Sequence, residues 1–244
     1  MIQITYDITR NFDLDYLIFD LIFFLIFLTV LIIKKKRKPL YVGLLCGVLF
    51  LIIDSIIWWN TGVREIFPPE YKFFVDFMMD FSYGLVAFSW VMIMFERNNL
   101  KEIILWTLFL YGGWLVTASL SQILPLLDLE ITTVRHMRSL RIVEIITVLC
   151  GFLLLIVLRY DYKTILYIFW IGFMLSFMME SYLLITQMRP SGVELLLYDS
   201  LILTNQGVPY LFVFFDKVLP KIKEIILNRK DLKDEKVELT NFVA

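Results

Sequence analysis

Apolar residues along the chain fall into seven long runs that short polar segments separate. A helix needs about 20 mostly apolar residues to cross the hydrocarbon core of a bilayer. The runs cover residues 16–33, 40–59, 73–95, 103–124, 140–158, 165–185 and 195–215. None of them shows the strict alternation of a transmembrane barrel strand. The pattern therefore predicts an all-α fold, a bundle of seven transmembrane helices. Because Gly207 and Pro209 stand inside the last run, we expect that helix to kink or partly unwind.

Lys and Arg residues are distributed unequally between the two sets of connecting segments. Sixteen of the 23 lie after the first, third and fifth runs or in the C-terminal tail. Such an excess marks the cytoplasmic side, so we expect the N-terminus outside the cell or in a lumen and the C-terminus in the cytoplasm. Residues 1–215 then form a multi-pass membrane domain, in a bacterial inner membrane, the ER or the plasma membrane. Residues 216–244 form a cytosolic tail, amphipathic and charged, that is either solvated or lies on anionic lipid.

Composition agrees with a membrane protein and removes several function classes. Hydrophobic residues make up 59 % of the chain and charged residues 19 %, against about 45–50 % and about 25 % in soluble domains. The net charge of −1 gives no basic footprint for nucleic acid. The single histidine cannot supply the zinc site of the ceramidase and adiponectin-receptor type, and residues 195–215 hold no lysine for a retinal Schiff base. The partners we expect are membrane lipids and lipid-soluble small molecules.

Seven acidic residues stand inside the predicted spans, where each is a functional hypothesis because burial of charge in lipid is costly. They are Asp20, Asp54, Asp76, Asp80, Glu144, Glu180 and Asp199. With the orientation above, all of them lie in the outer half of the bilayer. Helical spacing places several on faces that also carry aromatic, amide or hydroxyl side chains. These faces predict a cavity open toward the outer leaflet, lined by carboxyls and aromatic rings.

Structural explanations stand beside the functional ones. Asp20 and Asp76 are within a turn or two of the interface, and we expect them to face headgroups or water. Arg141 and Glu144 are three residues apart and could neutralise each other. Asp54, Asp80 and Glu180 lie deeper. For each of them considered alone, a structural hydrogen bond is as good an explanation as catalysis. The Gly43-Gly47 spacing indicates close helix packing.

One family resembles this chain in size, in its seven spans with short loops, and in an acid late in the second span. These are the integral-membrane terpene cyclases of meroterpenoid and indole-diterpene pathways. They carry a Trp-Glu pair in the second span, where this chain has Ile53-Asp54 with Trp58 one turn later. Their last span begins with Asp-Gly and aromatic residues, and here the corresponding pair is Gln206-Gly207. The resemblance covers most of the chain in topology and two short stretches in residues.

The resemblance implies a cofactor- and metal-independent cyclase that protonates an epoxide or alkene of a polyprenyl chain and holds the carbocation while rings form. Asp54 would be the proton donor. Because Gln206 stands where the family has its second acid, Glu180 or Asp80 would supply that acid instead. Aromatic faces stabilise cations, and exclusion of water protects them. The residues expected to line the substrate path are Trp58, Tyr83, Trp114, Phe177, Asn205, Gln206 and Tyr210.

Two other functions remain open at this level. A small proton-coupled transporter would use the acids to carry protons or a cation, but it needs polar residues in the inner half, which is nearly bare. A membrane sensor would bind a ligand in the outer cavity, but the cytoplasmic loops of about six or seven residues offer little surface for a partner. The cyclase hypothesis predicts that Asp54→Asn abolishes activity and leaves the protein folded.

Overall fold

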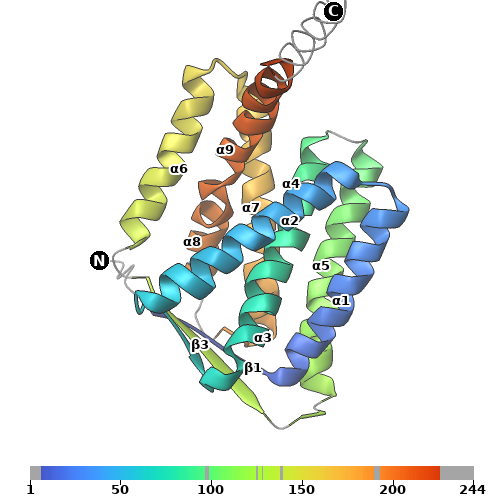
Figure 1. The fold of residues 1–244 in the computed structure, drawn as a ribbon, viewed down its shortest axis with the longest axis vertical. Helices are drawn as coiled ribbons and strands as arrows, with labels where there is room; N and C mark the ends of the chain where they lie inside the picture. The colour runs from blue at the N-terminus through green and yellow to red at the C-terminus, as the bar shows by residue number, and fades with distance from the viewer. Residues whose placement is uncertain are drawn as a thin grey trace, which may run out of the picture.

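The computed structural model describes residues 7–96, 99–124, 126–127, 129–137, 140–189 and 193–225 (Figure 1). Within these ranges six helical segments are long and apolar enough to cross a membrane, and each overlaps one of the first six predicted runs. The segments are Leu14–Ile33 (α1), Arg37–Trp58 (α2, then η1), Pro69–Phe95 (η2, α3, η3, α4), Leu100–Ile123 (α5), Leu140–Val157 (α6) and Tyr162–Ile185 (α7). The prediction of a helical, multi-pass membrane bundle is thereby confirmed.

Two of these segments change helix type along their length. In the second, α2 (Arg37–Leu51) passes into the π-helix η1 (Ile52–Trp58). The third is built from η2 (Pro69–Tyr71), α3 (Lys72–Asp76), the π-helix η3 (Phe77–Ser82) and α4 (Tyr83–Phe95). The π-helices carry Asp54 and Asp80. Such π segments are rare in proteins and are frequently found at functional sites.

The last part of the chain forms a broken helix. The helix α8 (Val193–Ile202) ends before the short turn η4 (Thr204–Gln206), and α9 (Val208–Val213) then begins and continues through η5 (Phe214–Val218). Pro209 stands in the first turn of α9, where its missing N–H costs no hydrogen bond. The expected interruption at Gly207 and Pro209 is confirmed. The helix extends to residue 225, so the first part of the predicted tail continues it, and residues 226–244 of that tail lie outside the described residues.

A three-stranded antiparallel sheet covers one end of the bundle, which we name the sheet end (Figure 1). Its strands are β1 (Asp7–Asp13), β3 (Glu130–His136) and β2 (Arg64–Phe67), with β3 in the middle. The sequence analysis predicts no strand: it leaves the segments of β2 and β3 as connections between spans, which is wrong, and assigns no element to residues 7–13. Strand geometry turns alternate side chains to one face, and the buried positions of β1 are Ile8, Arg10 and Phe12. The sheet therefore turns a basic residue toward the bundle together with apolar ones.

The strand register also brings three arginines together on this inner face. Arg64 pairs directly with Arg135, and Arg135 in turn faces Ile8 on β1. Arg10 lies two residues further along β1, which is the diagonal position on the same face. Like charges this close need acidic partners, and the bundle supplies most of them, as described below.

Close packing of α2 against α4 depends on glycines. A Cβ on Gly47 would lie 2.7 Å from the Phe81 carbonyl oxygen, and one on Gly84 would lie 2.7 Å from the Gly47 Cα. A Cβ on Gly43 would collide with the Leu85 backbone. The expectation that Gly43 and Gly47 mark a close helix contact is confirmed. This contact holds α2 against η3 and α4, and the acids of η1 and η3 then meet at Arg64.

Candidate functional site

A cavity of about 660 Å³ lies inside the bundle beneath the sheet. Its sheet-end lining is polar and includes Arg10, Tyr16, Asp20 and Arg135. Asp20 is four residues after Tyr16 on α1, so it lies one turn, about 6 Å, deeper in the bundle. The lining further from the sheet is mostly apolar, with Thr204 and Gln206 as polar members, and its apolar residues include Cys46, Phe50, Phe88, Leu211 and Phe214. The cavity is therefore amphipathic along its length.

The lining of the cavity reaches the outer surface of the bundle. Leu49 and Ile53, on α2 and η1, line the cavity and are exposed on the outside of the bundle. Val143 on α6 does the same from the other side. These exposed lining residues belong to helical segments that are long and apolar enough to cross a membrane, so the cavity reaches the surface between α2 and α6.

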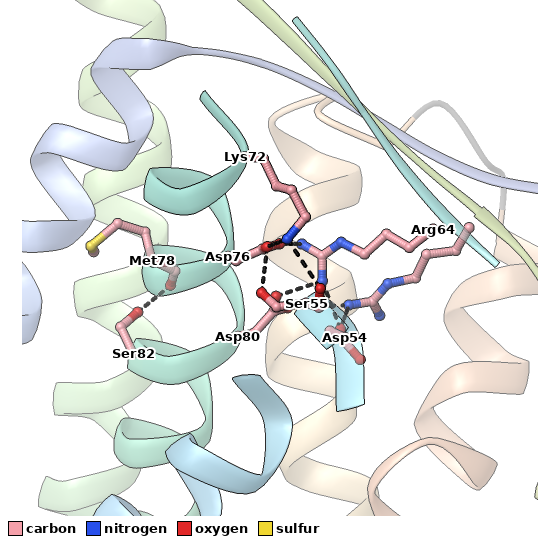
Figure 2. A network of polar contacts seen from close by, with 9 residues as sticks. Asp54, Ser55, Arg64, Lys72, Asp76, Met78, Asp80 and Ser82 are labelled. Atoms are coloured by element: carbon pink, nitrogen blue, oxygen red, sulfur yellow. Dashed lines mark hydrogen bonds and ion pairs between the residues drawn. The ribbon is translucent and has the colours of Figure 1, made fainter. Parts of the chain in front are cut away.

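The first ion-pair cluster joins the sheet to the π-helices (Figure 2). Arg64 reaches from β2 to Asp54 at 2.8 Å, to Asp80 at 2.5 Å and to Asp76 at 3.2 Å. Arg135 from β3 also pairs with Asp54 and with Asp80. Lys72 pairs with Asp76 at 2.6 Å, so three acids face three bases.

This cluster decides what Asp54 and Asp80 are suited to do. Each accepts hydrogen bonds from both Arg64 and Arg135. Charge-assisted hydrogen bonds of this kind stabilise a carboxylate rather than a carboxylic acid. The guanidinium of Arg135 also stacks over the ring of Trp58 at 5.2 Å. Asp54 and Asp80 therefore hold a basic side chain in place at the cavity wall.

The second ion-pair cluster lies between α6, α7 and α8. Arg189 pairs with Glu180 and, at 3.1 Å, with Asp199. Arg141 pairs with Asp199 at 3.1 Å and with Glu144 at 3.0 Å. The expectation that Arg141 and Glu144 neutralise each other is confirmed, with Asp199 as an additional partner. These contacts tie the broken last helix to its neighbours.

Arg10 differs from the other buried arginines. It is 9 % exposed and lines the cavity, yet no ion pair or hydrogen bond of its side chain is found within the described residues. Burial, then the charges of Arg189 and Arg135, lower the pKa of Arg10 to about 10. Its guanidinium is still protonated at neutral pH, so it presents a positive charge to the cavity.

Asp20 is the acidic counterpart without a base. It is buried and lines the cavity, and it accepts one hydrogen bond, from the Ser82 hydroxyl at 3.2 Å. No Lys or Arg in the described part of the chain pairs with it. Tyr16, one turn earlier, shares a hydrogen bond of 2.9 Å with Tyr182. The expectation that Asp20 and Asp76 face headgroups or water is wrong, because the sheet covers this end and both side chains are buried.

The predicted site residues divide into two groups. Those that line the cavity are Asp54, Asp80, Trp58, Tyr83, Trp114, Gln206 and Tyr210. Glu180, Phe177 and Asn205 are not among its lining residues. Glu180 belongs to the second ion-pair cluster, Phe177 stacks on Phe173, and the Asn205 amide donates to the Leu201 carbonyl.

Sequence reasoning did not single out Arg10, Tyr16, Arg135 or Tyr182 as cavity residues. For Arg10 a signal was present, because the apolar residues Ile8 and Phe12 stand at strand spacing and Arg10 lies between them on the same face. For Arg135 and Tyr182 only the fold brings the side chains to the cavity.

Within the described ranges no group of three His, Cys, Asp or Glu side chains is arranged to hold a metal ion. Comparisons with protein-family models, with curated proteins and with solved structures find no match. The function is therefore argued from the geometry of the cavity.

Proposed function

We propose that this chain is a membrane-embedded enzyme that isomerises a lipid-dissolved terpenoid (polyprenyl) substrate by acid–base chemistry, as a cyclase does. The broken helix is its seventh span, and the sheet end is the outer or lumenal end. One observation carries the proposal: Asp20, a buried carboxyl without a basic partner among the described residues, faces an aromatic-lined cavity that reaches the surface between α2 and α6.

The aromatic wall suits a cationic intermediate. Tyr83 stacks on Trp114 with ring centroids 5.8 Å apart, and Trp114 lies against Tyr182 at the same distance. All three line the cavity. The faces of aromatic rings attract positive charge, most strongly where water is excluded. A carbocation formed beside Asp20 would thus meet π-faces rather than a nucleophile.

In the proposed reaction the Asp20 carboxyl donates its proton to an epoxide oxygen or an alkene carbon of the substrate. The C–O bond or the π bond breaks, and a neighbouring alkene supplies the electron pair that closes the ring. A proton then leaves a carbon next to the final cation and returns to the Asp20 carboxylate. No electrons are gained or lost overall, so the product is an isomer of the substrate and no oxidant is needed.

This proposal gives Asp54 a different role from the one that the family resemblance implies. Asp54 and Asp80 accept from Arg64 and Arg135, which favours them as positioning residues for the polar end of the cavity. Asp20 takes the role of proton donor because no guanidinium of the described residues pairs with it.

The test compares lipid extracts from cells that make the wild-type chain, Asp20→Asn or Asp54→Asn, after feeding a panel of prenylated epoxides. Cyclisation leaves the mass unchanged and shifts chromatographic retention. We expect Asp20→Asn to lower product formation by about 10²–10⁴-fold, as removal of a general acid does, with a smaller loss in Asp54→Asn. Asp216→Asn, at an exposed acid near the opposite end of the bundle, is the matched control. Product at wild-type yield from Asp20→Asn, or none from the wild type, would contradict the proposal.

The broken last helix favours a second candidate, a small proton-coupled transporter. Transporters place interrupted helices at their binding sites, and here Thr204, Gln206 and Gly207 of the interruption line the cavity. Proteoliposomes with an imposed pH gradient separate the two functions. A transporter would accumulate an unchanged compound inside, whereas the enzyme would release an isomer irrespective of the gradient.

A further inference from the structure

We infer that the cavity binds an amphiphile with one oxyanion head group, a carboxylate or a phosphate monoester, and that Arg10 holds this head group at the sheet end. The inference names the substrate class for the proposed function and rests on it for the reaction, while binding itself is measured separately.

The first argument is the uncompensated charge of Arg10. The other buried arginines, Arg64, Arg141 and Arg189, each pair with at least two carboxylates. Arg10 is also buried, with 9 % of its surface exposed, and lines the cavity, but none of the described acids lies within ion-pair distance of it. A buried charge without a partner is costly. A ligand that brings an anion would remove that cost.

The second argument is that the local field around Arg10 is positive. The positive charges of Arg189 and Arg135 each change the pKa of Arg10 more than the negative charge of Glu180, which is the acid with the largest influence on it. Arg135 already pairs with Asp54 and Asp80. It therefore adds to the positive potential at Arg10 but does not itself require an anionic ligand. One guanidinium therefore remains for one oxyanion, which it can engage through two parallel N–H donors.

The third argument is the polarity of the rest of the cavity. Below Arg10 come the paired hydroxyls of Tyr16 and Tyr182, and then Asp20. Beyond them the lining is mostly apolar as far as Leu211 and Phe214, with Thr204 and Gln206 as polar members. An anionic head at Arg10 thus places the first carbons of an apolar chain beside Asp20, and the chain continues toward the lipid-facing mouth.

The proposed chemistry gives the anion a further purpose. A guanidinium that faces the cavity would repel a carbocation that forms there. A bound oxyanion neutralises Arg10 and leaves the aromatic faces of Tyr83 and Trp114 as the electrostatic surroundings of the cation. A neutral substrate would leave this repulsion in place.

The experiment uses the full chain in nanodiscs of phosphatidylcholine at mildly alkaline pH, where a fatty acid is ionised and Arg10 remains protonated. The probes share one brominated long alkyl chain and differ in the head group: carboxylate, monophosphate, primary alcohol or trimethylammonium. Bromine quenches tryptophan, and Trp58 and Trp114 line the cavity. The alcohol reports how much quenching arises from partition into the bilayer.

We expect the carboxylate, the phosphate or both to bind the wild type at least about tenfold more tightly than the alcohol, the usual value of a charge-assisted contact. Binding of the carboxylate alone indicates a fatty-acid-like ligand, and binding of the phosphate alone a lipid or prenyl phosphate. Arg10→Gln should abolish the preference. Arg37→Gln, at an exposed arginine of the opposite end, should keep it.

Equal affinity for the carboxylate, the phosphate and the alcohol in the wild type would overturn the inference, and so would an anion preference that survives Arg10→Gln. If Arg10→Gln does not fold, the wild-type comparison alone decides. An anion preference without any isomer formed would keep this inference and refute the proposed reaction. If isomers form from neutral epoxides and the chain shows no preference for anions, the proposed reaction is kept and this inference is refuted.

Discussion

Replacement of Arg64 by Met should destabilise the fold more than loss of any surface ion pair. The Arg64 side chain is 2 % exposed and pairs with Asp54, Asp76 and Asp80. Burial lowers the pKa of Arg64, but the charges of Asp80, Asp54 and Asp76 outweigh it and raise the pKa above its ordinary value. For the guanidinium itself the attraction thus exceeds the desolvation cost. Because the variant leaves three buried acids with two bases, we expect a loss of about 3–5 kcal/mol in the free energy of unfolding.

Thermal unfolding in detergent micelles measures this loss, with Lys36→Met as the control. Lys36 pairs with Glu96 at 2.8 Å and with Glu102 at 3.0 Å, but all three side chains are partly exposed. We expect the control to cost at most about 1 kcal/mol. At roughly 2–4 °C per kcal/mol for a chain of this size, Arg64→Met should lower the Tm by about 6–20 °C.

A double variant separates electrostatics from lost packing. Asp80→Asn removes one of the charges that Arg64→Met leaves unpaired, so the two changes together should cost less than the sum of the single changes. A Tm for Arg64→Met no lower than that of Lys36→Met would refute the reasoning. Strict additivity in the double variant would show that packing, rather than charge, explains the loss.

Two further predictions concern helix packing and the sheet end. Gly47→Ala should lower the unfolding free energy by about 1–3 kcal/mol because its Cβ would press against the Phe81 carbonyl. Gly112→Ala, with open space around the added Cβ, should raise the unfolding free energy by about 1 kcal/mol. Similar Tm values for the two variants would contradict this prediction. Asp15→Leu should cost about 2–3 kcal/mol because the buried Asp15 carboxylate accepts from the Leu126 backbone N–H at 2.7 Å. Asp15→Asn keeps an acceptor and should cost less, and equal loss in both variants would show that the hydrogen bond contributes nothing.

The sequence predicts the helical framework because lipid imposes a simple rule on composition and length. Each of the six described spans matches an apolar run to within a few residues, and the interruption near Pro209 follows from proline geometry. The sheet cannot be predicted from composition and length in this way. Its strands are short, and β1 pairs with residues 130–136, more than a hundred positions away. Local pattern holds no information about such a partner.

The basic partners of the acids are a different kind of omission. In the sequence analysis only Arg141 was given an acidic partner, Glu144. The bases Arg64, Lys72, Arg135 and Arg189 counted only toward orientation, yet each pairs with an acid inside the bundle. Acids within spans call for basic partners, since a lone charge is costly in a low-dielectric interior. Seven of the 23 Lys and Arg residues lie on the predicted outer side, and they equal the in-span acids in number. This match was visible in the sequence. Which base meets which acid depends on the sheet register, and that required the structure.

The sheet also bears on the choice between the two proposed functions. A transporter must open its binding site to water at each end in turn, whereas an enzyme for lipid-dissolved substrates needs only a lipid-facing mouth. Here Ile66 and Ile131 are buried beneath the sheet, and Arg64 fastens it to η1 and η3 through three ion pairs. Opening this end would break those ion pairs, at a cost of several kcal/mol. The mouth beside Ile53 needs no such rearrangement, and for this reason the geometry favours the enzyme.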